Sequence, residues 1–298
     1  MRFILLILSS ILLINSCSTR DELKSQTSKK SIQNYFYELS RISLPKELSW
    51  CGEKVPLDIP EVKERAERDF LLLLQQPGQI MLYLKRSGRY FPMYERKLKA
   101  AGLPADLKYL SVAESALYMA RSSAGAVGLW QFMSGTGKKY GLRIDSYVDE
   151  RKHPEKSTDA AIKLLNNLYE EHNSWTLAGA AYNMGNAGLK NNLQFQKTKD
   201  YFDLYLNSET SRYIFRISLI KYFLENYSEL GIYLDENEFY KETPSKTIKV
   251  KSRINNLNEW AENKGCTYKD VKLLNPWILK RELNLPYNGY TYEIKIPE

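Results

Sequence analysis

One glutamate of the sequence, Glu114, falls on the apolar side of a predicted helix. Leu103, Leu107, Leu110 and Leu117 are spaced by four, three and seven residues, which places them along one side of a helix together with Glu114. A carboxylic acid held against apolar groups has its charged form disfavoured, so its pKa rises and it can donate a proton near neutral pH. Cleavage of a glycosidic bond needs such a general acid. The spacing alone leaves a second interpretation open, in which Glu114 pairs with a lysine or an arginine.

Other catalytic chemistries find little support in the residues. The two histidines, His153 and His172, lie outside any recognisable serine-histidine-acid context, and we expect both at the surface. Besides Cys17, the thiols are Cys51 and Cys266, and these residues give no metal-ligand spacing. No glycine-rich phosphate loop is present in the sequence, so we expect neither a metal nor a cofactor. Cys51 and Cys266 either pair as a disulfide or remain free thiols.

The elements that must position Glu114 are mainly helical. From residue 59 to about residue 230 the apolar pattern repeats every 3.6 residues and is interrupted by Gly, Pro, Ser and Asn. Helices are predicted near residues 60–75, 78–86, 90–101, 105–118, 126–139, 157–172, 174–184 and 209–225. After residue 245 the pattern predicts a strand at 247–250, helices at 257–261 and 268–275, and a closing strand at 290–296. The sequence therefore predicts a mainly α domain and a small strand-helix-helix-strand module.

The N-terminal residues have the order of a secretory signal. Arg2 precedes an apolar run over residues 3–14, and Asn15, Ser16 and Cys17 follow it. The apolar run is too short to span a bilayer. Residues 18–45 are polar and rich in Ser, Lys and Thr, which is typical of a tether.

Composition narrows the class of partner. The chain has 298 residues, of which 43% are hydrophobic and 26% charged, and this suits a globular protein. The net charge of +8 favours anionic polymers. Peptidoglycan and nucleic acid both fit this charge, but the sequence contains no basic cluster with a nucleic-acid fold signature, so we expect no nucleic acid.

Several separated motifs, in order from about residue 60 to residue 230, resemble the lytic transglycosylase domain. They are Leu103–Leu110 leading into Glu114-Ser115, Ser123–Met133, Thr136-Gly137, Tyr140–Leu142, Ala180–Gly185 and Glu209-Thr210-x-x-Tyr213. The resemblance implies a lysozyme-like helical fold. Leu117 and Met119 depart mildly from the family pattern, in which an aromatic residue and a proline are usual. The C-terminal module resembles a degenerate lysin motif, and the junction before Cys17 resembles the lipobox of bacterial lipoproteins.

The resemblance implies cleavage of the bond between N-acetylmuramic acid and N-acetylglucosamine in peptidoglycan, with 1,6-anhydro ends as product. Glu114 would act as the single general acid and base. The residues that match substrate-binding positions of the family are Ser123, Gln131, Tyr182 and Asn183, with Glu209 and Tyr213 carried over as walls of the site. Gly125 and Gly128 either let the backbone approach the sugar or are simply loop glycines.

The expected organisation is a lipoprotein signal peptide at residues 1–17, a tether at 18–45, a transglycosylase domain at 46–232 and a lysin-motif-like peptidoglycan-binding module at 245–298. Acylation of Cys17 would anchor a monomer in the bacterial cell envelope facing the periplasm, and Ser18 after it is compatible with the outer membrane. Four alternatives stay open. The domain could be a non-catalytic scaffold, or it could hydrolyse the bond with Asp145 or Asp149 as second carboxylate. The module could pack on the helices without binding sugar, and the signal peptide could be an ordinary cleaved one in which Cys17 is incidental.

Overall fold

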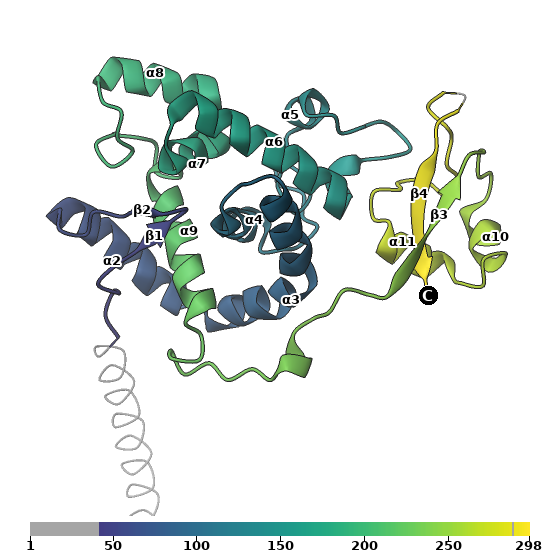
Figure 1. The fold of residues 1–298 in the computed structure, drawn as a ribbon, viewed down its shortest axis with the longest axis horizontal. Coiled ribbons are helices and arrows are strands. Elements are labelled where there is room, and N and C mark those ends of the chain that lie inside the picture. Colours follow the sequence, from purple (N-terminus) through teal and green to yellow (C-terminus); the bar gives the residue numbers. More distant parts are fainter. Residues whose placement is uncertain (1–41, 288) are drawn as a thin grey trace, which may run out of the picture. The chain divides into compact units, whose positions relative to one another are not determined.

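The computed structural model describes residues 42–287 and 289–298 of the chain (Figure 1). Residues 46–298 form one compact unit. The predicted signal peptide, Cys17 and the tether up to residue 41 lie outside the described residues. Among the residues described, no helix combines the length and the apolar character needed to cross a membrane. The prediction of a mainly helical chain with a small strand-containing module at its end is confirmed.

Two long helices follow a short hairpin of β1 (Ser49–Trp50) and β2 (Glu53–Lys54). They are α2 (Pro60–Leu74) and α3 (Pro77–Ala100), and each begins with a proline. Proline suits the first helical position because its fixed φ is helical and its missing N–H has no partner there anyway. The hairpin is anchored by the buried Trp50, whose Nε1 donates to the carbonyl oxygen of Asp106 at 2.9 Å.

The prediction of two separate helices at 78–86 and 90–101 was wrong, because α3 is continuous. Gly88 and Pro92 suggested a break. The connector after the helical part packs against this point, since a Cβ on Gly88 would lie 2.8 Å from Cβ of Phe239. The backbone N–H of Tyr240 also donates to the carbonyl oxygen of Lys85 at 2.7 Å. Gly88 therefore provides room for a packed segment, and the buried face of the helix continues past it.

The centre of the helical part is α9 (Thr210–Glu225), which packs against α2, α4 (Lys108–Ser115) and α7 (Trp175–Met184) (Figure 1). Ile214, Phe215, Ile217 and Leu219 of α9 are all fully buried. These buried residues make α9 a support for α4, whereas Arg216 of the same helix is exposed.

Residues 126–133 are not helical, so the predicted helix at 126–139 is confirmed only for α5 (Ser134–Lys139). Residues 120–133 form a loop held by the isolated bridges Arg121–Val127 and Val127–Phe132. Gly125 and Gly128 have φ of +89° and Gln131 has φ of +47°, which a helix does not allow. A short turn, η1 (Ala105–Leu107), precedes α4, and another, η2 (Glu150–Lys152), precedes α6 (Pro154–His172).

The helix α8 (Asn186–Gln196) was not predicted. Leu189 is its one buried residue, so it has no apolar stripe that a sequence pattern could reveal. The connector that follows α9 contains the short turn η3 (Glu236–Glu238).

The C-terminal module has the predicted order of elements: β3 (Ser245–Val250), α10 (Leu257–Glu262), α11 (Tyr268–Leu274) and β4 (Tyr292–Pro297). The two strands pair antiparallel, with Ile248 opposite Ile294. The side-chain amide of Asn275 donates to the carbonyl oxygens of Val271 and Lys295, which fixes the end of α11 to β4. Cys266 of this module and Cys51 of the hairpin are both free thiols, so the open question of a disulfide between them is answered in the negative.

Candidate active site

Glu114 lies in the last turn of α4, where the helix ends one residue later at Ser115. The chain leaves the helix through Ala116 and Leu117, which both adopt positive φ, so the predicted helix at 105–118 ends early. Leu107, Leu110 and Leu117 are buried, but of the four leucines of the predicted helix face only Leu110 lies in α4, and Leu103 is only half-buried. The carboxyl group of Glu114 accepts a hydrogen bond from the hydroxyl of Tyr213 rather than from a lysine or an arginine.

Burial raises the pKa of Glu114 from its ordinary value of 4.5 to about 7. The hydrogen bond from Tyr213 and the positive charge of Arg216 oppose this rise, whereas the negative charge of Glu209 adds to it. A carboxyl group with this pKa has both its protonated and its ionised form populated near neutral pH. It can therefore give a proton to a leaving group and afterwards take one up.

Glu114 opens into a pocket of about 350 Å³ between α2, α3, α4, α7 and α9. Of the residues predicted for the site, Asn183, Glu209 and Tyr213 also line this pocket. Further polar residues of the lining, not predicted from the sequence, are Asp69, Gln76, Tyr83, Arg212 and Arg216.

Asn183 is held in one orientation by its neighbours. Its side-chain nitrogen donates to Oε1 of Glu209 at 3.0 Å, and its side-chain oxygen accepts from the buried hydroxyl of Thr210 at 2.7 Å. The amide nitrogen has two N–H groups, so one remains available to a ligand in the pocket. Glu209 thus accepts a hydrogen bond from Asn183, and its negative charge raises the pKa of Glu114.

Tyr182 and Gln131 bind backbone atoms of the loop at residues 120–133. The hydroxyl of Tyr182 donates to the carbonyl oxygen of Trp130 at 2.6 Å. The side chain of Gln131 donates to the carbonyl oxygens of Gly128 at 2.8 Å and Ala120 at 3.3 Å. Neither residue lines the pocket of Glu114. Burial, and then the charge of Glu114, raise the pKa of Tyr182 well above its ordinary value, so it stays a neutral hydroxyl near the acid.

The loop is also hydrogen-bonded to α4, which carries Glu114. Ser111 and Ser115 of α4 both donate to the carbonyl oxygen of Leu129, at 3.0 and 2.8 Å. Ser123 is exposed on the loop and lies outside the lining of the pocket. The structure therefore brings Glu114, Asn183, Glu209 and Tyr213 into one pocket and places Ser123, Gln131 and Tyr182 on or against the neighbouring loop.

Two family models match this chain. Residues 92–204 match the transglycosylase SLT domain, and residues 246–298 match the C-terminal LysM-like domain of soluble lytic transglycosylases. The chain thus carries a transglycosylase SLT domain and a LysM-like domain. The match to the SLT domain includes Glu114 and the 120–133 loop, but it ends before Glu209 and Tyr213.

Among curated proteins, the chain is similar to membrane-bound lytic murein transglycosylase D of Escherichia coli strains K12 and O6:H1. The identity is 28% over 192 residues, which cover 62% of this chain and 42% of the relative. The chain therefore spans less than half the length of these relatives. Two solved structures are also similar. An inactive variant of the lytic transglycosylase Slt from Pseudomonas aeruginosa has a TM-score of 0.38 at 24% identity, over 51% of this chain and 26% of that one. The 70 kDa soluble lytic transglycosylase from Escherichia coli has 0.40 at 22% identity, over 51% and 27%.

The pocket residues that the sequence analysis missed belong to two groups. Arg216 lies three residues after Tyr213 on α9, so helical spacing from Tyr213 could have found it, and Arg212 lies one turn before Arg216. Asp69 and Tyr83 come from α2 and α3, and only the fold brings them to the pocket. The Nε atom of Arg212 donates to Asp69 at 2.6 Å, which connects α9 with α2 across the pocket.

The two histidines differ from each other. His172 binds the side chain of Asn186 at 2.8 Å. His153 was expected at the surface, but its ring stacks on Trp277 of the LysM-like domain with 5.5 Å between centroids. Across the described part of the chain, no group of histidine, cysteine and acidic residues could hold a metal ion.

Proposed function

We propose that this protein is a peptidoglycan lytic transglycosylase in which Glu114 is the single general acid and base. The observation that carries the proposal is a carboxyl group with a pKa of about 7, on the SLT domain, opening into a polar pocket. Such a group is the one that a mechanism with a single carboxylate requires, because it must hold a proton in one step and lack it in the next.

In the first step, protonated Glu114 gives its proton to the oxygen that joins N-acetylmuramic acid to N-acetylglucosamine, and the bond from that oxygen to C1 of the muramyl sugar breaks. In the second step, the C6 hydroxyl of the same sugar bonds to C1 and its proton passes to ionised Glu114. The acid returns to its starting state and no water is consumed. The product is a 1,6-anhydromuramyl end.

The pocket offers support for both steps. The hydroxyl of Tyr213 binds one oxygen of the carboxyl group, which leaves the second oxygen to face the substrate. The N-acetyl oxygen of the substrate would stabilise the positive charge that develops at C1, as in substrate-assisted glycosidases. Asn183 keeps one N–H free beside Glu114 and is held by Thr210 and Glu209, so it is suited to orient that N-acetyl group.

Hydrolysis is the competing reaction. The acids first considered for it are engaged elsewhere, since Asp145 binds Arg143 and Asp149 forms an ion pair with Arg151. Glu209 lines the pocket of Glu114 and is therefore the better candidate for a second carboxylate. The hydrogen bond from Asn183 to Glu209 favours a positioning role for this residue instead.

The test is mass spectrometry of the muropeptides that residues 18–298 release from purified sacculi, with Glu114→Gln as control. We expect anhydromuramyl products from the wild-type protein and almost none from the variant, because the amide fills the same space but cannot transfer the proton. Reducing ends would establish hydrolysis instead, and Glu209→Gln would then be tested for their loss. Binding without release would support the scaffold interpretation.

The proposal for location is a lipoprotein of the cell envelope, anchored through acylated Cys17 and facing the periplasm, with the outer membrane as its destination. It rests on the secretory order of residues 1–17 and on the similarity to a membrane-bound relative. In cell fractionation, Cys17→Ala should move the protein to the soluble fraction. Continued membrane attachment of this variant would contradict acylation.

We propose peptidoglycan as the ligand of the LysM-like domain as well.

A further inference from the structure

Arg151 binds both ends of the glycine-rich part of the loop beside the pocket. Its side chain is 7% exposed, and its Nη1 atom donates to the carbonyl oxygens of Gly125 and Phe132, each at 3.1 Å. Gln131 and the backbone that Tyr182 contacts lie between these two acceptors. One guanidinium group therefore closes the part of the loop that carries the predicted substrate residue Gln131.

The backbone of Arg151 is also in close contact with the loop. A Cβ on Gly128 would lie 2.0 Å from the carbonyl oxygen of Arg151, so the two segments touch backbone to backbone. The position of the loop consequently follows the position of Arg151. Glycine is needed at position 128 for this close approach, because a Cβ there would collide with the carbonyl oxygen of Arg151.

Asp149 fixes the guanidinium in turn. The Nε and Nη2 atoms of Arg151 donate to the two carboxylate oxygens of Asp149 at 2.9 and 2.8 Å, which is a bidentate pair. This pair uses one edge of the guanidinium and leaves Nη1 for the loop. Both side chains are buried, so the pair is shielded from solvent.

The same segment is paired with the LysM-like domain. Val148 and Ile278 form an antiparallel bridge, with the N–H of Asp149 donating to the carbonyl oxygen of Trp277 at 2.9 Å and that of Leu279 to Tyr147 at 2.8 Å. Val148 is fully buried in the hydrophobic core of the module. Residues 147–149 therefore complete a structure that is otherwise built from the C-terminal residues.

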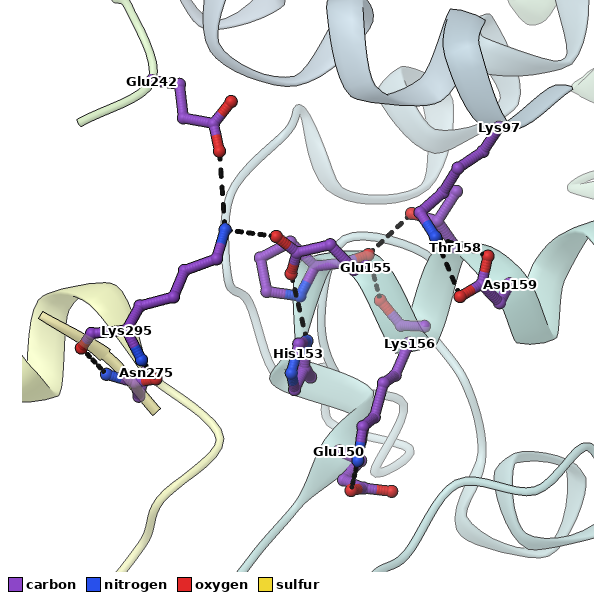
Figure 2. A network of polar contacts seen from close by, with 12 residues as sticks. Lys97, Glu150, His153, Glu155, Lys156, Thr158, Asp159, Glu242, Asn275 and Lys295 are labelled. Carbon is purple, nitrogen blue, oxygen red and sulfur yellow. Dashed lines mark hydrogen bonds and ion pairs between the residues drawn. The ribbon is translucent and has the colours of Figure 1, made fainter. Parts of the chain in front are cut away.

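Side chains strengthen this junction. Lys295 of β4 binds Glu155 in the first turn of α6 and also pairs with Glu242, and His153 binds Glu155 (Figure 2). The ring of His153 stacks on Trp277. The segment between Tyr147 and Glu155 is thus bound to the LysM-like domain at both of its ends and holds Arg151 between them.

We propose that Arg151 is a positioning residue for the substrate loop, and that the LysM-like domain keeps it in place through the pairing of residues 147–149 with residues 277–279. This proposal rests on the proposed transglycosylase function for its kinetic consequence. Its structural consequence, a loop at residues 120–133 whose opening is suppressed by Arg151 and by the module, does not depend on that function.

The first experiment compares Arg151→Lys and Arg151→Met in the full chain of residues 18–298. Lysine keeps the charge beside Asp149 but lacks the planar fork, so it cannot bind Asp149 bidentately and the loop at once. We expect amide hydrogen exchange in residues 120–133 to rise about tenfold or more in both variants, while α9 stays protected. We expect kcat on sacculi to fall about tenfold or more with sacculus binding retained, because Arg151 does not line the pocket.

The second experiment tests the contribution of the LysM-like domain with a matched pair of variants at Leu279. This residue is exposed, and its backbone N–H donates one of the hydrogen bonds beside the Val148–Ile278 bridge. Leu279→Pro removes this N–H, and Leu279→Ala keeps it. We expect the proline variant to raise exchange in residues 120–133 and to lower kcat, and the alanine variant to behave as wild type.

Two results would overturn the inference. Wild-type exchange of the loop in Arg151→Met would refute the positioning role. Wild-type exchange in Leu279→Pro, with an effect in Arg151→Met, would refute the contribution of the LysM-like domain. If the wild-type protein released no muropeptides, the proposed function would fail, but the exchange data would still decide the inference.

Discussion

Replacing Glu114 by glutamine should stabilise the protein at alkaline pH. The folded state holds the pKa of Glu114 at about 7, whereas the unfolded chain has the ordinary value of 4.5. Between these two values the folded protein binds a proton that the unfolded chain has lost, so the free energy of unfolding falls as the pH rises. The free energy of unfolding stops falling above the folded-state pKa of Glu114. Glutamine does not titrate, so the Glu114→Gln variant does not lose this stability.

The magnitude follows from the difference between the two pKa values. Each pKa unit is worth about 1.36 kcal/mol, so the rise from 4.5 to about 7 corresponds to about 3 kcal/mol. The difference in free energy of unfolding between Glu114→Gln and the wild type should therefore grow by about 3 kcal/mol between pH 4 and pH 8.5. The variant should gain this stability and lose the activity, which is the trade-off expected of a catalytic acid kept in an apolar setting.

The assay is urea unfolding of both proteins at a series of pH values, followed by circular dichroism of the helices. Taking the difference between the two proteins removes the titration of groups that they share. Glu61→Gln, which removes a carboxylate from the exposed side of α2, controls for the change in net charge. A difference that stays constant within about 0.5 kcal/mol, or that falls with pH, would refute the argument that burial keeps Glu114 protonated.

Three further predictions concern the surroundings of the acid. Tyr213→Phe removes a hydrogen bond that lowers the pKa of the buried glutamate, so the alkaline limb of the pH profile of kcat/KM should move to higher pH; an unchanged or lower limb would contradict this. Thr210→Val leaves the side-chain oxygen of Asn183 without its donor, and kcat should fall about tenfold while urea unfolding changes by less than about 2 kcal/mol. Gly128→Ala forces a methyl group to 2.0 Å from a backbone oxygen at a φ of +89°, and should destabilise the protein by about 2 kcal/mol or more, whereas Gly135→Ala in open space should not.

The sequence was sufficient to predict features that depend on a single helix or strand. The leucine spacing around Glu114 predicted a carboxyl group on an apolar helix face, and Leu110 of α4 is buried, whereas Leu103 and Leu117 lie outside this helix. Helices with an apolar stripe or a proline start, such as α2 and α9, were predicted within a few residues. The alternation of the last residues predicted β4, and the structure shows that it pairs with β3.

The sequence was insufficient to predict features that depend on contacts between distant segments of the chain. The apolar residues Val127 and Trp130 have helical spacing, yet the close approach of Arg151 to Gly128 imposes a loop on them. His153 carries no local sign of its contact with Trp277, which lies more than a hundred residues later. Asp69 and Tyr83 reach the pocket only because α2 and α3 pack around α4 and α9. Each of these cases depends on tertiary contacts that no local pattern contains.

Opposing effects on the carboxyl group explain why the pKa of Glu114 is about 7 rather than far above it. Burial and the negative end of the helix dipole both disfavour the carboxylate, and Glu209 adds a negative charge. Without opposing effects the pKa would be higher, and the acid would donate its proton less readily. Tyr213 and Arg216, which lie on one side of α9, stabilise the carboxylate in opposition to them. Tyr213 is buried on α9, which packs against α4, so its part in this balance depends on the packing of α4 on α9.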